Sequence, residues 1–246
     1  MDPGYYVAAG SLQARSYELD VVANNLANAA TVGYKPDMPF FAVFDKAAAS
    51  GRGLPLTPYV NDGVVFGETG VDFKQGSLRA TGRPLDVAIE GNAFFTVQTP
   101  QGPRITRDGR FQMGASGQLE AEDGAPVLGK NGQPILLDPK LGSVTITSDG
   151  TVQQGSKVVG QLDLTAYAKP GALKRVGDLR YDPTGQATAP VKATVAQGHL
   201  EQSAVDPASA MVEMIRLNRL FDMSEKVAST FANDLDASSI NDIAKS

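Results

Sequence analysis

Apolar and small residues alternate with a seven-residue period near the N-terminus. Large side chains recur at every seventh position, and small ones lie three or four residues away from them. The positions are Tyr5, Ala9, Leu12, Ser16, Leu19, Ala23 and Leu26. This pattern is typical of one face of a helix that packs against another helix. It predicts a helix over residues 5–30, with Gly33 as a left-handed stop.

A second stripe of this kind lies near the C-terminus, where the steps alternate between three and four residues. Its members are Met214, Leu217, Phe221, Ser224, Ala228, Phe231 and Leu235. Asp206 supplies a helix cap, and Pro207 suits the first helical position. The sequence therefore predicts a second helix over residues 207–236.

The middle of the chain has the turn signals and short apolar runs that are typical of antiparallel β structure. Turn dipeptides occur at Asp62-Gly63, Asp108-Gly109, Asp123-Gly124, Asn131-Gly132 and Asp149-Gly150. Short apolar runs flank them, and we predict strands at 87–89, 94–98, 104–106, 110–113, 144–147, 158–164 and 191–196. Residues 36–66 show no periodicity and are expected to form an extended connector.

These patterns predict an α+β protein with a central antiparallel β-rich domain between two terminal helices. The expected boundaries are 1–33 for the first helix, 34–67 for the connector, 68–200 for a β domain that folds alone, and 201–246 for the second helix. Two interpretations of the helices remain open. They pair within the chain, or both pack against copies of themselves, because one pair buries only a narrow stripe on each helix.

Composition narrows the functional classes. The chain has 246 residues with 26 Gly and 15 Pro, which favours a turn-rich β fold over a helical bundle. A net charge of −5 without a basic cluster argues against a nucleic-acid partner. The absence of Cys excludes disulfides and thiol chemistry. We expect no cleaved signal peptide and no membrane insertion, since the first residues lack a basic and apolar leader and no apolar run spans a bilayer.

Several segments resemble the flagellar rod and hook axial proteins. The N-terminal signature comprises Asn24 to Asn28 and Thr31, followed by Gly33-Tyr34-Lys35. A middle signature runs from Gly82 to Phe95 and continues at 106–111. The C-terminal signature comprises 198–203, 211–215 and 240–243. Two positions depart from the usual glycine of that family, Ala93 and Ala244. Length and connector are most similar to the proximal rod type (FlgF), and next to the distal rod type (FlgG).

This resemblance implies a structural role without catalysis, cofactor or metal. The two helices would form a coiled-coil-like inner tube of a hollow helical rod, a drive shaft that transmits torque to the hook. The β domain would form its outer shell. The implied partners are copies of the chain, other rod and hook axial proteins, the flagellar type III export apparatus and the bushing ring proteins. The implied location is the basal body, in the periplasm of an organism with an outer membrane.

Individual residues allow more than one interpretation. Asn24, Asn25 and Asn28 are unusual inside a helix; they are either solvated or, as the resemblance implies, polar contacts between neighbouring helices. Phe94 and Phe95 are expected in the core, together with Phe111.

Enzymatic activity has little support in the sequence. The sole histidine, His199, has no nucleophile elbow to accompany it, and no phosphate-binding, dinucleotide-binding or zinc-protease motif occurs. Nothing singles out a pair of carboxylates of the kind that glycosidases use. The alternative from another class is a secreted adhesin or glycan-binding module on a helical stalk, which would share the β middle but not the signatures at both ends.

Overall fold

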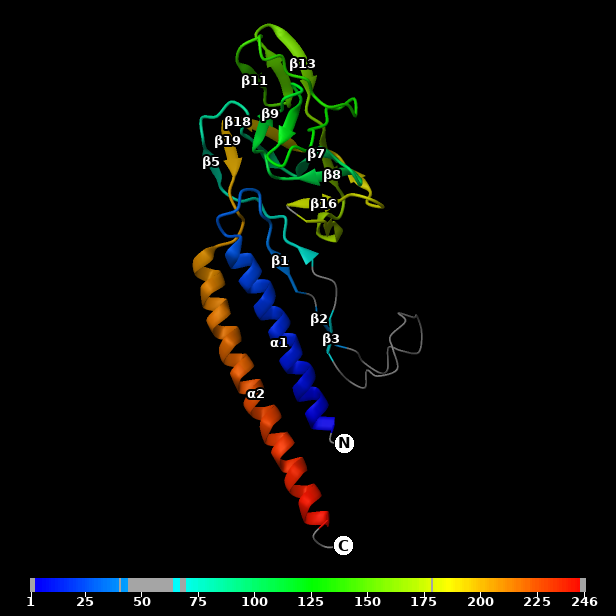
Figure 1. The fold of residues 1–246 in the computed structure, drawn as a ribbon, viewed down its shortest axis with the longest axis vertical. Coiled ribbons are helices and arrows are strands. Elements are labelled where there is room, and N and C mark those ends of the chain that lie inside the picture. The colour runs from blue at the N-terminus through cyan, green and yellow to red at the C-terminus, as the bar shows by residue number, and fades with distance from the viewer. Residues whose placement is uncertain (1–2, 40, 44–63, 67–69, 178, 244–246) are drawn as a thin grey trace. The chain divides into compact units, whose positions relative to one another are not determined.

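The fold is described from a computed structural model. It describes the backbone of residues 3–39, 41–43, 64–66, 70–177 and 179–243, and the side chains of 10–39, 70–177 and 179–230. These residues divide into two compact units. One contains both helices and the strands β2 and β3; the other contains residues 27–37 and 70–206 and is rich in β structure (Figure 1).

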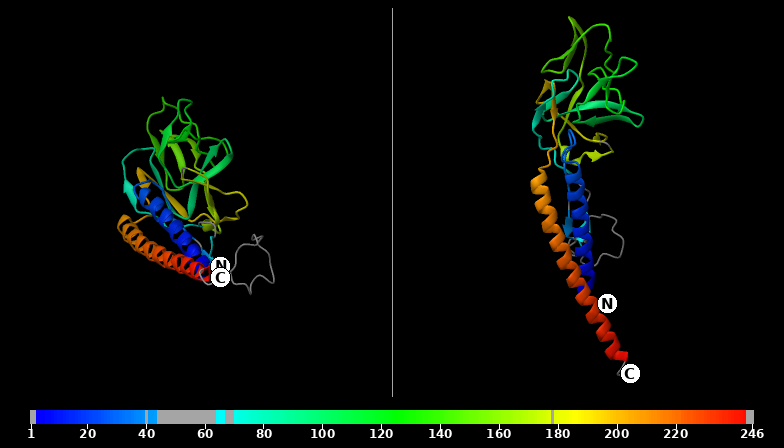
Figure 2. Two further views of the ribbon diagram at one scale, coloured as in Figure 1. Left: turned by 60° about the horizontal axis from the view of Figure 1, so that its bottom comes forward. Right: turned by 60° about the vertical axis from the view of Figure 1, so that its left-hand side comes forward.

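The helical unit consists mainly of α1 (Pro3–Ala27) and α2 (Pro207–Ile243), which run side by side and antiparallel (Figures 1 and 2). β2 (Phe41–Val43) and β3 (Val64–Phe66) form an antiparallel pair. Of the predicted connector, residues 40, 44–63 and 67 lie outside the described residues.

Both predicted helices are present, with different ends. α1 stops at Ala27, short of the predicted 30, and turns follow in which Thr31 N donates to Asn28 O at 3.1 Å. The Thr31 hydroxyl also donates to the Asn28 side chain, a local bond that competes with the helix. α2 begins at Pro207 as predicted but runs past 236 to Ile243, since the sequence after Pro207 contains neither Gly nor Pro.

The β unit contains one sheet of six strands in the order β15-β16-β8-β7-β14-β17. Their bounds are β7 (Ala93–Thr99), β8 (Gly102–Thr106), β14 (Leu164–Tyr167), β15 (Lys174–Arg175), β16 (Arg180–Asp182) and β17 (Thr188–Ala189). A sheet of three strands comprises β11 (Val144–Ile146), β12 (Thr151–Gln154) and β13 (Lys157–Gln161).

Smaller antiparallel pairs complete the unit. They are β5 (Leu78–Ala80) with β19 (His199–Glu201), β6 (Val87–Gly91) with β18 (Ala193–Gln197), and β9 (Phe111–Met113) with β10 (Leu119–Ala121). β1 (Asp37–Met38) pairs with β4 (Gly70–Val71), and a 3₁₀ turn covers Pro170–Ala172. Each predicted strand overlaps one of these. The run 158–164 is split, because Leu162 N and Asp163 N bond to Gly150 O and Leu128 O as the chain changes sheets.

The predicted turn glycines behave in two ways. Gly124, Gly132 and Gly150 have φ between 73° and 85°, as tight turns require. Gly109 is not in this group, and the hairpin turn expected at Asp108-Gly109 is not formed, because the strands that it joins, β8 and β9, do not pair with each other. A Cβ at Gly109 would lie 1.6 Å from Val87 O, so glycine is needed there for close approach of two backbones. Asp62-Gly63 lies outside the described residues.

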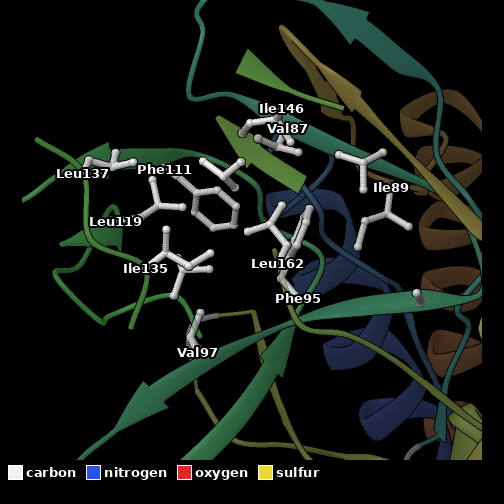
Figure 3. Packing of buried hydrophobic residues seen from close by; sticks show 14 residues of the cluster. Val87, Ile89, Phe95, Val97, Phe111, Leu119, Ile135, Leu137, Ile146 and Leu162 are labelled. Atoms are coloured by element: carbon white, nitrogen blue, oxygen red, sulfur yellow. The ribbon is translucent and has the colours of Figure 1, made fainter. Parts of the chain in front are cut away.

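Two apolar clusters form the core, one on each face of β7. Ala93, Phe95 and Val97 belong to the larger cluster and Phe94 to the smaller, as the alternation of a strand dictates. In the larger cluster the rings of Phe95 and Phe111 meet edge to face at 5.0 Å (Figure 3). The prediction that Phe94, Phe95 and Phe111 are core residues is confirmed, since each is at most 1% exposed.

The architecture is α+β as predicted, but the β-rich domain is not confined to a central stretch. Residues 27–37 and 201–206, which the sequence assigns to the helices and the connector, belong to the β unit. Hydrogen bonds explain why: Gly33 N donates to Glu201 O, Ala204 N donates to Tyr34 O, and Gln202 N donates to Ser77 O, at 2.8–3.0 Å.

Candidate functional site: the junction of the terminal segments

Three charged side chains meet in the interior of the β unit. Lys35 Nζ lies 2.5 Å from Glu201 Oε1, and Arg107 Nη1 lies 3.3 Å from Glu201 Oε2. All three are at most 3% exposed. Charged groups are almost never fully buried unless they are paired, and here each charge has a partner of opposite sign. We call Lys35, Arg107 and Glu201 the junction cluster.

Backbone groups complete the coordination of this junction cluster. Lys35 Nζ donates to Lys74 O at 2.6 Å, and Gly76 N donates to Glu201 Oε1 at 2.8 Å. Arg107 Nη2 donates to Gly91 O at 2.6 Å, and the Arg107 guanidinium lies 4.9 Å from the centre of the Phe94 ring. These partners are needed because one carboxylate must serve two cations. Burial lowers the pKa of Lys35, and the charge of Glu201 opposes that shift.

Gly33 brings the segment after α1 against the β unit. Its φ is 69°, and a Cβ there would lie 2.8 Å from Asp108 N and 2.9 Å from Arg107 C. A side chain at this position would therefore push the segment away from Arg107. Gly33 lies in the turns after the helix rather than at its last residue, and close approach is a second reason for glycine here.

A second set of contacts, centred on Arg175, holds the same segment beside the junction cluster. The Arg175 guanidinium is 4.7 Å from the Tyr34 ring and 5.3 Å from the Tyr181 ring. It donates to Lys35 O at 2.5 Å and to Asp37 Oδ1 at 2.9 Å. Burial, reinforced by the charge of Asp37, raises the pKa of Tyr34 to about 12. Residues 34–37 are thus fixed from both sides.

Replacing Glu201 with glutamine is expected to destabilise the protein by about 3–5 kcal/mol, because two buried cations would lose their carboxylate. Lys35→Met should cost less, about 1–3 kcal/mol, since the Arg107–Glu201 pair survives and only hydrogen-bond partners are lost. The measurement is urea unfolding followed by near-ultraviolet circular dichroism of tyrosine. Glu90→Gln, on an exposed side chain of β6, is the control and should change the free energy of unfolding by less than about 0.5 kcal/mol. Equal effects of Glu201→Gln and Glu90→Gln would refute a stabilising role of the cluster.

The predicted α1 stripe lies mostly on one side of the helix. Ser16 and Ala23 are exposed, Leu12, Leu19 and Leu26 are partly buried, and the side chains of Tyr5 and Ala9 lie outside the described range. Among the α1 side chains that the structure describes, Ala14 and Val21 are the most buried. Each lies two positions after a stripe leucine, which is about 200° around a helix. The chain therefore buries the side opposite the stripe most deeply and covers the stripe leucines only in part.

On α2 the arrangement is reversed. Leu217 is 3% exposed, and Met214, Phe221 and Ala228 are partly buried, so the predicted stripe occupies the covered side. The side chains of Phe231 and Leu235 lie outside the described range. The opposite side carries exposed apolar residues that the sequence analysis did not single out: Met211, Val212, Ile215, Met223 and Val227.

The polar residues that the sequence analysis considered, three asparagines and the histidine, do not come together in a site. Asn24 is exposed, Asn25 and Asn28 are partly buried, and Asn28 accepts from Thr31. His199 lies in β19, where its Nδ1 is 2.9 Å from Gln197 O. Among the described residues, no group of three His, Cys, Asp or Glu side chains is placed to hold a metal ion. Neither α1 nor α2, over its described residues, is apolar enough along its length to cross a membrane.

The junction cluster was missed because its partners are far apart in sequence. Lys35 and Glu201 are separated by 166 residues, and neither belongs to a charge pattern. The available signal was the resemblance itself, since Lys35 ends the N-terminal signature and Glu201 lies within the C-terminal one.

The chain thus combines two long helices that carry apolar residues with a β unit in which a buried ion-pair cluster fixes residues from both ends of the unit. Family models match three segments of the chain. Residues 6–35 match "Flagella basal body rod protein", 88–154 match "Flagellar hook protein FlgE/F/G D1 domain", and 196–241 match "Flagellar basal body rod FlgEFG protein C-terminal". Each matched segment contributes one member of the junction cluster.

Whole-chain relatives identify the family. The flagellar basal-body rod protein FlgF of Caulobacter vibrioides is 37% identical over 255 residues, covering 100% of this chain and 99% of the relative. FlgF of Mesorhizobium japonicum is 34% identical and covers 90% of both chains. The rod protein FlgG of Buchnera aphidicola is 30% identical, covering 94% of this chain and 96% of its own. The chain belongs to the flagellar basal-body rod protein family. It is a structural subunit of the flagellum basal body and not an enzyme.

Proposed function

We propose that this subunit builds the rod through α1 and α2. The helices of many subunits pack into a coiled-coil-like tube around a hollow channel, the β unit forms the outer layer, and the resulting drive shaft transmits torque to the hook. The observation that carries this proposal is the α1 stripe. Leu12, Leu19 and Leu26 are only partly buried by the chain, whereas Ala14 and Val21 on the opposite side are buried, so part of each leucine side chain is left for contact with a partner.

The finer assignments follow from the same proposal. The partners are copies of this chain and other axial proteins of the rod and hook, with Asn24, Asn25 and Asn28 supplying polar contacts between helices. The subunit reaches its site through the flagellar type III export apparatus, without a cleaved signal, and lies in the periplasmic part of the basal body, where ring proteins surround it. FlgF-type relatives have the higher identities, 37% and 34% against 30%, which supports the proximal tier.

The test is co-purification from cells. A tagged chain is expected in hook–basal bodies extracted with detergent, at several copies per particle. Its presence only in the soluble fraction or on the cell surface would contradict the proposal and favour an adhesin, for which the relatives give no support.

A further inference from the structure

The exposed side of α2 carries two parallel stripes of opposite charge. The acidic stripe consists of Met211, Ile215, Asp222 and Glu225, and the basic stripe consists of Val212, Arg216, Arg219, Met223 and Val227. Every one of these residues is exposed. The two stripes flank the line of α2 opposite the buried Leu217, one on either side of it.

The spacing places each set on one strip of the helix surface. Members of the acidic stripe are separated by four, seven and three residues, and those of the basic stripe by four, three, four and four. Residues three, four and seven apart lie above one another on a helix. The two stripes are offset by about 100°, since Met211 and Val212 are adjacent in sequence. Lys226 lies at their border.

Each stripe combines apolar side chains with charge of one sign. Met211 and Ile215 are 52% and 56% exposed, and Val212 is 67% exposed. Large apolar side chains gathered at this exposure mark a contact surface. Of the charged members, Arg216 has a partner on its own helix, Glu213 at 3.2 Å, in an exposed pair three residues apart. Such a pair contributes little, so Arg216 is available to another carboxylate.

The charges of the two stripes indicate which kind of partner binds this side of α2. An uncharged apolar partner would strip water from four charged groups without replacing it, which is costly. A nucleic acid or another polyanion would use the basic stripe and be repelled by the acidic one. A second copy of this chain satisfies both, because its basic stripe fits the acidic stripe of its neighbour.

We propose that the acidic stripe of one α2 docks on the basic stripe of α2 in the next copy of the chain. Two different surfaces on each subunit make a head-to-tail contact, which generates rings or helical polymers rather than closed dimers. This inference rests on the proposed assembly through the terminal helices and adds the surfaces and their polarity.

The test reverses each stripe in the full chain. Arg216→Glu with Arg219→Glu should lower incorporation into basal bodies at least tenfold, and so should Asp222→Lys with Glu225→Lys, because each sets like charges opposite one another. The chain with all four substitutions should recover most of the incorporation, since the stripes again match. Circular dichroism of each purified variant shows whether the β unit is still folded.

Cysteine cross-linking identifies the occupant, and the natural chain has no Cys to interfere. With Ile215→Cys and Met223→Cys in one chain, a bismaleimide should give a ladder at multiples of 25.8 kDa in basal bodies, whereas either single cysteine should give at most a dimer. Products of another mass would overturn the second copy as partner.

The charge reversals have their own contradicting outcomes. Paired reversals that incorporate normally, or a fourfold variant that incorporates no better than they do, would overturn the pairing of the stripes. If the unaltered chain is absent from basal bodies, the proposed function itself fails.

Discussion

Cells carrying Leu19→Asp in this subunit are expected to lack rods, hooks and filaments, although the protein is made and its β unit folds. Leu19 lies in the middle of the α1 stripe, on the side opposite the buried Ala14 and Val21. Burial of one leucine contributes about 1.5–3 kcal/mol, and a carboxylate against apolar neighbours reverses the sign. In a helical polymer the penalty recurs with every added subunit. Swimming in soft agar and electron microscopy of basal bodies measure the effect.

The matched control is Gln13→Asp. Gln13 is exposed and lies off the stripe, so it receives the same carboxylate on the same helix and should leave cells motile. Normal swimming of the Leu19→Asp strain would show that this stripe does not build the rod. Loss of motility in both strains would mean that α1 tolerates no added acid, and the stripe would lose its special role.

A fragment of residues 27–206 is expected to fold as a soluble, cooperative unit, whereas 68–200 is not. The shorter fragment lacks Lys35 and Glu201, so Arg107 would be buried without its carboxylate. It also loses the hydrogen bonds from Gly33 N, Ala204 N and Gln202 N. An unpaired buried charge costs about 3–5 kcal/mol, a large part of the 5–15 kcal/mol that stabilises a typical domain.

Urea unfolding of both fragments decides the matter. The longer fragment should show one sigmoidal transition by tyrosine circular dichroism. The shorter one should aggregate or unfold gradually. Equal, cooperative transitions would support the boundaries that the sequence alone predicts and would show that the junction cluster contributes little to folding.

The repeating elements could be predicted from sequence because their signals are local. Heptad spacing gave both helices, and turn dipeptides with short apolar runs located the strands. This spacing did not locate the end of α1, because Thr31 bonds to the backbone and side chain of Asn28 and these local bonds compete with the helix. The Lys35–Arg107–Glu201 cluster has no local signal at all, since no pattern of neighbouring residues marks a contact over 166 residues.

Sequence periodicity also could not predict which face of each helix the chain covers. Ala14 and Val21 are also seven residues apart and apolar enough to be buried, so α1 has two candidate faces. Periodicity identifies both but does not rank them, because the ranking depends on which face the rest of the chain covers. On α2 the exposed apolar side was not predicted, because charged residues between Met211 and Val227 give it the pattern of a solvent-exposed helix face.

A map of isolated hook–basal bodies by electron cryo-microscopy would show directly whether the subunit assembles through its terminal helices. We expect α1 and α2 of this chain in the wall of the rod, with Leu12 and Leu19 against helices of neighbouring subunits and the β unit outside them. A map in which the chain contacts its neighbours only through the β unit, with both helices out of the wall, would contradict it.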